Sequence, residues 1–350
     1  MIFSCSQSEE DLQFVVWQQR NPIPNAIGWA GMSAGASRGV LIAGGGANFP
    51  DRPPWAGGTK AWSKELFVLP TQDGVWKSVS ARFPQPLAYA VCVSDGQQVI
   101  MAGGESPLEE GAGTRCRDEV LKLEWSGSDV QIFPLPALPV PITNAAGALV
   151  GTDFYVAGGT LSPSATTAEN HVFCLDSSSP ESHGWKTIES FPGPGRMLAV
   201  AAAWDGRFYL FGGVSLSQDD HGKPVRTPLV DCYCFAPAAG WKRLADLPVA
   251  VTAAPSPAPA FDGRIVLLGG DDGSQMNAPP EQHRGFSSRF LTYDVEKDCF
   301  HNAGSFPAPR VTAPLVPWDQ SWFLISGELR PGVRSPAVWQ FSLNNMPPEE

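Results

Sequence analysis

The chain has 350 residues, of which 43% are hydrophobic and 17% charged, a composition typical of a compact globular protein. Its 36 glycines and 34 prolines predict many turns between short strands. No apolar run reaches the roughly 20 residues that cross a bilayer, and a net charge of −11 argues against nucleic acid or a membrane surface as a partner.

The seven cysteines are scattered, without a C-x-x-C pair or a Cys/His spacing typical of zinc. We therefore expect buried apolar thiols in a reducing compartment and no bound metal. The first 13 residues lack a basic segment followed by an apolar one. This predicts a cytoplasmic protein, or a periplasmic or secreted one if a signal peptide has been removed.

The first predicted strand runs from Leu12 to Trp17, and after it an apolar run ending in a glycine pair recurs along the chain. Its six copies precede Gly44-Gly45, Gly103-Gly104, Gly158-Gly159, Gly212-Gly213, Gly269-Gly270 and, more weakly, Ser326-Gly327. The intervals of 54 to 59 residues leave room for four strands and their loops in each unit.

Two further markers repeat in phase with the glycine pairs. An apolar residue followed by proline precedes each unit, at Pro24, Pro84, Pro139, Pro192, Pro248 and Pro307. A tryptophan lies upstream of four of these prolines, at Trp17, Trp76, Trp185 and Trp241. The near-constant spacing from proline to glycine pair indicates one structural unit repeated six times.

Each unit divides into the same four strands. A short strand a, such as Leu198–Trp204, leads through a turn into the apolar strand b that ends at the glycines. A loop of variable length precedes strand c, as in His171–Asp176 and Arg289–Asp294, and strand d carries the tryptophan. The continuous apolar runs of strand b predict burial on both faces, and the glycines allow close approach of backbones.

This pattern resembles the kelch family over essentially the whole chain. We therefore predict an all-β fold: a single six-bladed kelch-type β-propeller over residues 1–350, with four antiparallel strands in each blade. The last predicted strand, Ala337–Leu343, has the character of a strand c. The N-terminal strand is then expected to complete the C-terminal blade, which removes the open edges of the ring.

Candidate site residues lie in the connections that emerge on one face of such a ring. The b–c loops of blades one and five, residues 46–62 and 271–287, are long, whereas that of blade six, residues 328–335, is nearly bare. Long loops on a rigid scaffold commonly carry binding residues. Anion-binding candidates are Lys60, Arg284, Arg196 and Arg310, proton-transfer candidates are Glu105, Glu281 and His283, and further substrate contacts are Asn48, Asp51 and Trp55.

Each of these residues also has a purely structural explanation. Arg196, at a d–a corner, equally serves to pair with a neighbouring blade, and Trp55 equally serves to pin a proline-rich loop. Glu281 and His283 are equally ordinary solvated loop residues. Function therefore has to be argued from the assembled site rather than from any one side chain.

The blade-one loop is the most distinctive segment. Its series Gly44-Gly45-Gly46-Ala47-Asn48-Phe49-Pro50-Asp51, with Pro54-Trp55, Gly57-Gly58, Lys60 and Trp62, resembles the cyclically permuted branch of the N-acetylneuraminate mutarotase (epimerase) family. The His283-x-Gly285-Phe286 segment of blade five is similar to the same family.

The resemblance implies a cofactor-independent isomerase that interconverts the α and β anomers of a small sugar acid, N-acetylneuraminate. On this hypothesis Arg310 or Arg284 binds the substrate carboxylate, while Glu281 or His283 shares proton transfer with Glu105. The sequence is equally compatible with a monomer and a homodimer. The alternative is a non-catalytic kelch propeller that binds a sugar acid or a protein partner.

Overall fold

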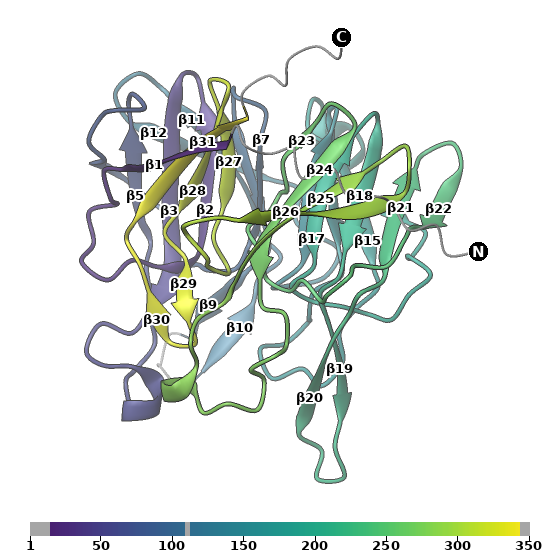
Figure 1. Ribbon diagram of the computed structural model, residues 1–350. Helices are drawn as coiled ribbons and strands as arrows, with labels where there is room; N and C mark the ends of the chain where they lie inside the picture. The colour runs from purple at the N-terminus through teal and green to yellow at the C-terminus, as the bar shows by residue number, and fades with distance from the viewer. Residues whose placement is uncertain (1–14, 109–112, 344–350) are drawn as a thin grey trace.

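The computed structural model describes residues 15–108 and 113–343, which form six four-stranded antiparallel sheets arranged around a central axis (Figure 1). The first three blades contain, in strand order a to d, β2 (Ala30–Ser37), β3 (Val40–Asn48), β5 (Glu65–Leu69) and β6 (Lys77–Arg82); β7 (Val91–Ser94), β8 (Val99–Ala102), β11 (Val120–Trp125) and β12 (Val130–Leu135); and β13 (Ala146–Val150), β14 (Asp153–Ala157), β15 (Val172–Asp176) and β16 (Lys186–Ile188).

The last three blades contain β17 (Val200–Trp204), β18 (Arg207–Phe211), β21 (Cys232–Ala236) and β22 (Gly240–Arg243); β23 (Ala260–Phe261), β24 (Arg264–Gly270), β25 (Ser287–Asp294) and β26 (Cys299–Ser305); and β27 (Leu315–Trp318), β28 (Ser321–Ile325), β31 (Val338–Leu343) and β1 (Val15–Arg20). The predicted six-bladed all-β propeller is thereby confirmed.

The b–c connections contain further short strands and helical turns. They are β4 (Ala61–Trp62), which pairs with the end of β3, the hairpins β9 (Glu105–Pro107)–β10 (Thr114–Cys116), β19 (Val214–Gln218)–β20 (Pro224–Pro228) and β29 (Glu328–Arg330)–β30 (Val333–Arg334), and the 3-10 turns η1 (Pro54–Ala56) and η2 (Pro280–Gln282). One short helix, α1 (Pro180–His183), lies between β15 and β16. In the described part of the chain, no helix is long and apolar enough to span a membrane.

The two ends of the described chain meet in blade six, where β1 pairs antiparallel with β31 and places Trp17 opposite Phe341. The Trp17 ring lies 4.4 Å from that of Phe341 and 5.4 Å from that of Phe306, so the closing strand is also anchored by its side chain. The predicted closure is confirmed, and the part of the expected strand before Val15 lies outside the described residues.

Strand b of each blade is buried on both sides because the blades pack face to face. In β3, Leu41 belongs to the core cluster shared with blade six, and its neighbour Ile42 belongs to the cluster shared with blade two. Successive side chains of a strand point to opposite faces, so a strand between two blades needs apolar residues at every position. This explains the uninterrupted apolar runs in the sequence.

The glycine pairs occupy two consecutive left-handed backbone positions. In blade two, Gly103 and Gly104 have φ of 69° and 101°, and blade six repeats this with Ser326 at 55° and Gly327 at 101°. Glycine is favoured because a side chain is strained at positive φ. In blade one the pair in this conformation is Gly45-Gly46, one residue later than the predicted Gly44-Gly45.

Six residues at the d–a corners form a closed ring of backbone hydrogen bonds around the axis, which we call the corner ring. All six have φ between 50° and 65°. Each amide donates to the carbonyl of the next member at 2.7 to 3.3 Å, in the order Gly31, Thr312, Ala253, Leu198, Asn144, Tyr89 and back to Gly31. This cyclic arrangement fixes the blades to one another at the channel.

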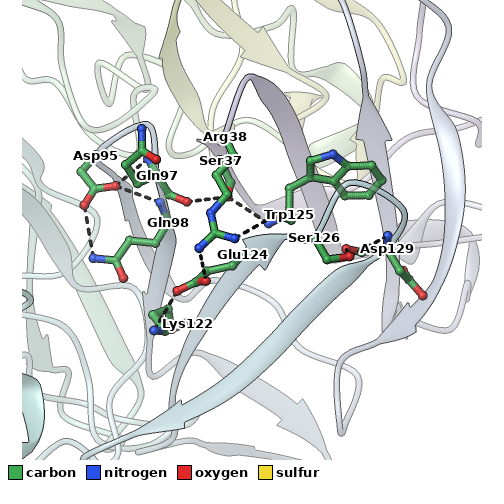
Figure 2. Close-up of polar contacts among 10 residues, drawn as sticks. All are labelled: Ser37, Arg38, Asp95, Gln97, Gln98, Lys122, Glu124, Trp125, Ser126 and Asp129. Atoms are coloured by element: carbon green, nitrogen blue, oxygen red, sulfur yellow. Dashed lines mark hydrogen bonds and ion pairs between the residues drawn. The ribbon is translucent and has the colours of Figure 1, made fainter.

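At the opposite ends of the strands, side chains connect blades one and two (Figure 2). Arg38, in the turn after β2, donates to Glu124 of β11 at 2.6 Å. The hydroxyl of Ser37 donates to the Gln97 carbonyl and accepts the amide of Trp125. These contacts stabilise the blade interface on the face away from the b–c loops.

Candidate functional site

The hairpins β9–β10, β19–β20 and β29–β30 all project from the same face of the ring, the lower side of Figure 1. Strand a begins and strand b ends at this face, as the pairing of Ala30 with Ala47 shows. The loops of blades one, five and six touch. The Arg330 guanidinium lies 5.7 Å from the Trp55 ring centroid, and its Nη1 is 3.4 Å from the carbonyl oxygen of Glu281.

The central channel opens beneath these loops. Its cavity is lined by all six members of the corner ring, together with small residues at the starts of the inner strands. In each blade, the residue that follows the left-handed pair lies next to the corner ring. In three blades this residue is acidic: Glu105, Asp271 and Glu328. Backbone geometry therefore brings carboxylates from three blades to one channel mouth.

Glu328 and Arg334 form a mostly buried ion pair in the β29–β30 hairpin. Arg334 Nη1 lies 3.1 Å from Glu328 Oε1, and the two side chains are 5% and 14% exposed. The same carboxylate oxygen accepts the Gly332 amide at 2.6 Å. Arg334 also lies over the Phe49 ring, and its buried Nε has no hydrogen-bond partner among the described residues. An unpaired buried donor is costly, so this guanidinium would gain from an additional acceptor.

Burial raises the pKa of Glu328, against the lowering effects of Arg334, the Gly332 amide, Lys60 and Arg226. Removing a carboxylate from water disfavours its charged form. A carboxyl group with a raised pKa exchanges protons more readily near neutral pH than an exposed one. Glu328 thus has the environment of an acid–base group.

Lys60 crosses from the blade-one loop to blade two, where its Nζ lies 2.5 Å from Glu105 Oε1. The ammonium is also 4.7 Å from the Trp62 ring centroid and 4.6 Å from that of Tyr89. Glu105 is buried, whereas the Lys60 side chain is 28% exposed. Two of the sequence candidates, Lys60 and Glu105, are therefore brought together at the mouth.

The remaining candidates of the blade-one loop lie apart from this ion pair. Asn48 is buried and donates from Nδ2 to the Gly28 carbonyl at 3.0 Å, while its Oδ1 has no partner among the described residues. Asp51 is exposed, and Trp55 is partly buried in η1 under Arg330. Asn48 holds the base of the loop, and Trp55 joins it to blade six.

The blade-five candidates lie on and beside η2. Glu281 and Arg284 are exposed, whereas His283 is 5% exposed and packs on Phe286 with ring centroids 5.1 Å apart. His283 Nδ1 accepts the Gly285 amide at 3.1 Å, which leaves Nε2 as the protonated nitrogen in the neutral ring. These contacts order the blade-five loop.

Arg196 and Arg310 lie inside their own blades. Arg196 is fully buried, with Nη2 2.6 Å from Asp231 Oδ2 and Nη1 2.9 Å from the Gly212 carbonyl. Arg310 donates from Nη1 to the carbonyls of Ser326 and Ala337. Burial lowers the pKa of Arg310 to about 10. Both guanidinium groups thus have backbone partners in place of an open site.

Four residues in or near the Glu328–Arg334 pair were not predicted from the sequence: Glu328, Arg334, Tyr89 and Arg226. The blade-six loop, predicted to be nearly bare, is the hairpin that holds the Glu328–Arg334 pair. One sequence signal points to Glu328: it directly follows Ser326-Gly327, as the candidate Glu105 directly follows Gly103-Gly104. Arg226 of β20 is exposed, and its charge acts on Glu328 from blade four.

In residues 15–108 and 113–343, no three His, Cys, Asp or Glu side chains cluster closely enough to hold a metal ion. Cys92, Cys116, Cys174, Cys232 and Cys234 are free thiols. Burial raises the pKa of the Cys232 thiol to about 12, so this group stays protonated at neutral pH.

Comparisons with known proteins agree with the motifs. A family model described as N-acetylneuraminate epimerase matches residues 135–278. The N-acetylneuraminate epimerase of Yersinia pestis (strain Pestoides F) is 30% identical over 238 residues, which are 59% of this chain and 56% of that protein. The chain thus spans little more than half the length of this relative.

Two further proteins widen the comparison. The N-acetylneuraminate epimerase of Brucella melitensis is 28% identical over 273 residues, covering 65% of this chain and 67% of that one. The solved structure titled "Structure of YjhT" superposes with a TM-score of 0.65 over 92% of this chain and 96% of that chain, at 16% identity, and supports the fold. Together these matches confirm the resemblance to the N-acetylneuraminate epimerase family that the motifs of blades one and five indicate.

Proposed function

We propose that this protein is a sialic acid mutarotase, an isomerase that interconverts the α and β anomers of N-acetylneuraminate without a cofactor. The observation that carries the proposal is the Glu328–Arg334 pair at the channel mouth, a buried carboxyl with a raised pKa beside a guanidinium whose buried Nε is unpaired among the described residues. The names of the relatives support the choice of substrate.

Anomer exchange of a sugar acid makes three demands on a site. The anomeric hydroxyl must lose a proton, the ring oxygen must gain one, and the substrate carboxylate needs a cation. Glu328 is assigned as the base for the anomeric hydroxyl. Arg334 is assigned to the carboxylate, because guanidinium groups form paired, charge-assisted hydrogen bonds with carboxylates. Arg226 of blade four, whose charge acts on Glu328, adds positive charge.

The reaction then proceeds by ring opening. As Glu328 takes the anomeric proton, the bond between the anomeric carbon and the ring oxygen breaks and a keto group forms. The ring oxygen receives a proton from a second group at the mouth. Rotation about the adjacent carbon–carbon bond and reversal of the steps give the other anomer. Each positioned acid or base typically contributes on the order of 10²- to 10⁴-fold.

The test is one-dimensional NMR of anomer exchange with freshly released α-N-acetylneuraminate. Wild-type protein should exceed the spontaneous rate, and Glu328→Gln should reduce the enzymatic rate by on the order of 10²-fold or more. Glu124→Gln, at the contact with Arg38 between blades one and two (Figure 2), is the control and should retain activity. Saturation transfer without acceleration would support a non-catalytic sugar-acid binder. No ligand signal at all would favour a propeller that binds a protein partner.

A further inference from the structure

Tyr89 differs from the other members of the corner ring in its side chain. It is the only aromatic member, and its backbone takes a φ of 59°, which a bulky side chain rarely adopts. The other members are Gly31, Asn144, Leu198, Ala253 and Thr312. Non-glycine residues in this conformation persist where the surroundings fix them, often at functional sites. Tyr89 therefore projects a phenol from a rigid position at the channel.

The Tyr89 ring extends from blade two over blade one. A Cβ atom on Gly31 would lie only 2.4 Å from Tyr89 Cδ1 and 2.7 Å from Cε1, so the ring occupies the space that a side chain of blade one would fill. Lys60 Nζ lies 4.6 Å from the centre of the same ring. Glycine at position 31 and lysine at position 60 together form a cradle for the phenol.

The charged groups at the channel mouth interact electrostatically with the Tyr89 phenol. Burial raises the pKa of Tyr89, and the charges that act on it are those of Lys60, Glu328, Arg334 and Glu105. The hydroxyl is therefore protonated throughout the neutral range. By contrast, Oε1 of Glu105 is already paired with Lys60 at 2.5 Å. Of these two candidates for delivering a proton, the Tyr89 hydroxyl is the one outside this ion pair.

We propose that Tyr89 is the general acid of the reaction, and that its hydroxyl gives its proton to the ring oxygen of the sugar as the ring opens. The assignment rests on the proposed mutarotase function. The phenolic O–H bond breaks and a new O–H bond forms at the ring oxygen, while Glu328 accepts the proton of the anomeric hydroxyl. On reclosure both protons return. The transient tyrosinate lies beside the Lys60 ammonium, which compensates its charge.

Tyr89→Phe is the first test, because it removes the hydroxyl and keeps the ring packed on Gly31. We expect kcat for anomer exchange to fall on the order of 10²-fold or more, with KM within about threefold of wild type. Tyr155→Phe, a phenol buried between blades three and four, is the matched control and should retain full activity. A Tyr89→Phe enzyme with kcat within about threefold of wild type would overturn the assignment.

Chemical rescue gives a second, independent readout. Glycine accepts a φ of 59° without strain, so Tyr89→Gly leaves a ring-sized space above Gly31 in an unchanged backbone. Added phenol should restore part of the lost kcat, whereas toluene, which has the shape without the acid, should not. Rescue by both compounds alike would show that Tyr89 serves only packing. A wild-type protein that does not accelerate exchange would overturn the mutarotase function itself, which separates the two failures.

Discussion

Glu105 and Glu328 occupy the same position in blades two and six: each follows the left-handed pair and forms an antiparallel bridge with the d–a corner, Glu105 to Ala88 and Glu328 to Val311. Their surroundings nevertheless differ. Glu105 is paired with a lysine from another blade, whereas Glu328 is paired with an arginine of its own hairpin. The repeat thus supplies two equivalent carboxylates, and the loops give each a different environment.

The pH dependence of activity should report on Glu328. Burial raises its pKa above the ordinary 4.5, and a base works only when ionised. Activity should therefore increase as pH rises through a midpoint above 4.5. The measurement is kcat/KM for anomer exchange from about pH 4 to about pH 8, with the spontaneous rate subtracted. Glu328→Gln should lose this limb of the profile, and a variant that kept it would point to another base.

Arg334→Lys should weaken substrate binding although the charge is retained. Lysine lacks the planar fork and the Nε donor that the structure leaves free. Losing a hydrogen bond between charged groups costs about 1.5–3 kcal/mol, so KM should rise roughly tenfold to a hundredfold. Steady-state kinetics by NMR would check this. An unchanged KM would remove Arg334 from the carboxylate site.

Arg196→Met distinguishes a structural arginine from a substrate ligand. The substitution leaves Asp231, whose side chain is 14% exposed, without its cation. Breaking a buried pair by removing one partner typically costs about 3–5 kcal/mol. Urea denaturation should show a loss of about that size, with KM unchanged in the folded protein.

The exposed pair formed by Arg243 and Asp246 supplies the control for this experiment. Arg243→Met should change stability far less, because a solvated pair contributes little. If Arg196→Met raised KM and left the urea midpoint unaltered, Arg196 would have to be returned to the substrate-binding residues.

Ser326 should contribute to closure of the ring between blades six and one. Its Oγ lies 2.8 Å from both the amide nitrogen and the carbonyl oxygen of Trp29, and 2.8 Å from the Ser335 carbonyl oxygen. Ser326→Gly keeps the left-handed backbone and removes these contacts, which leaves a buried amide without its acceptor. We expect a loss of about 1–3 kcal/mol in the free energy of unfolding. Equal stability in thermal and urea unfolding would show that the backbone bonds alone close this interface.

Much of the site was not visible in the sequence because its residues come from loops of different blades. Lys60 and Glu105 were both candidates, yet nothing in their spacing predicted that they pair. His283 looked like a loop residue available for catalysis, and it is buried on Phe286. The corner arginines are candidates for an anion in the sequence, yet their Nη1 atoms bond carbonyls in segments 16 to 35 residues away.

By itself, the sequence determined the six blades, their strand order and the closure by the N-terminal strand. These features repeat in phase, and each repeat of about 60 residues contains its own buried apolar strands and its own turn residues. Only the tertiary structure decided which side chains share the channel mouth. The curvature of the ring brings residues from several blades together, and that convergence depends on packing between blades rather than on any local pattern.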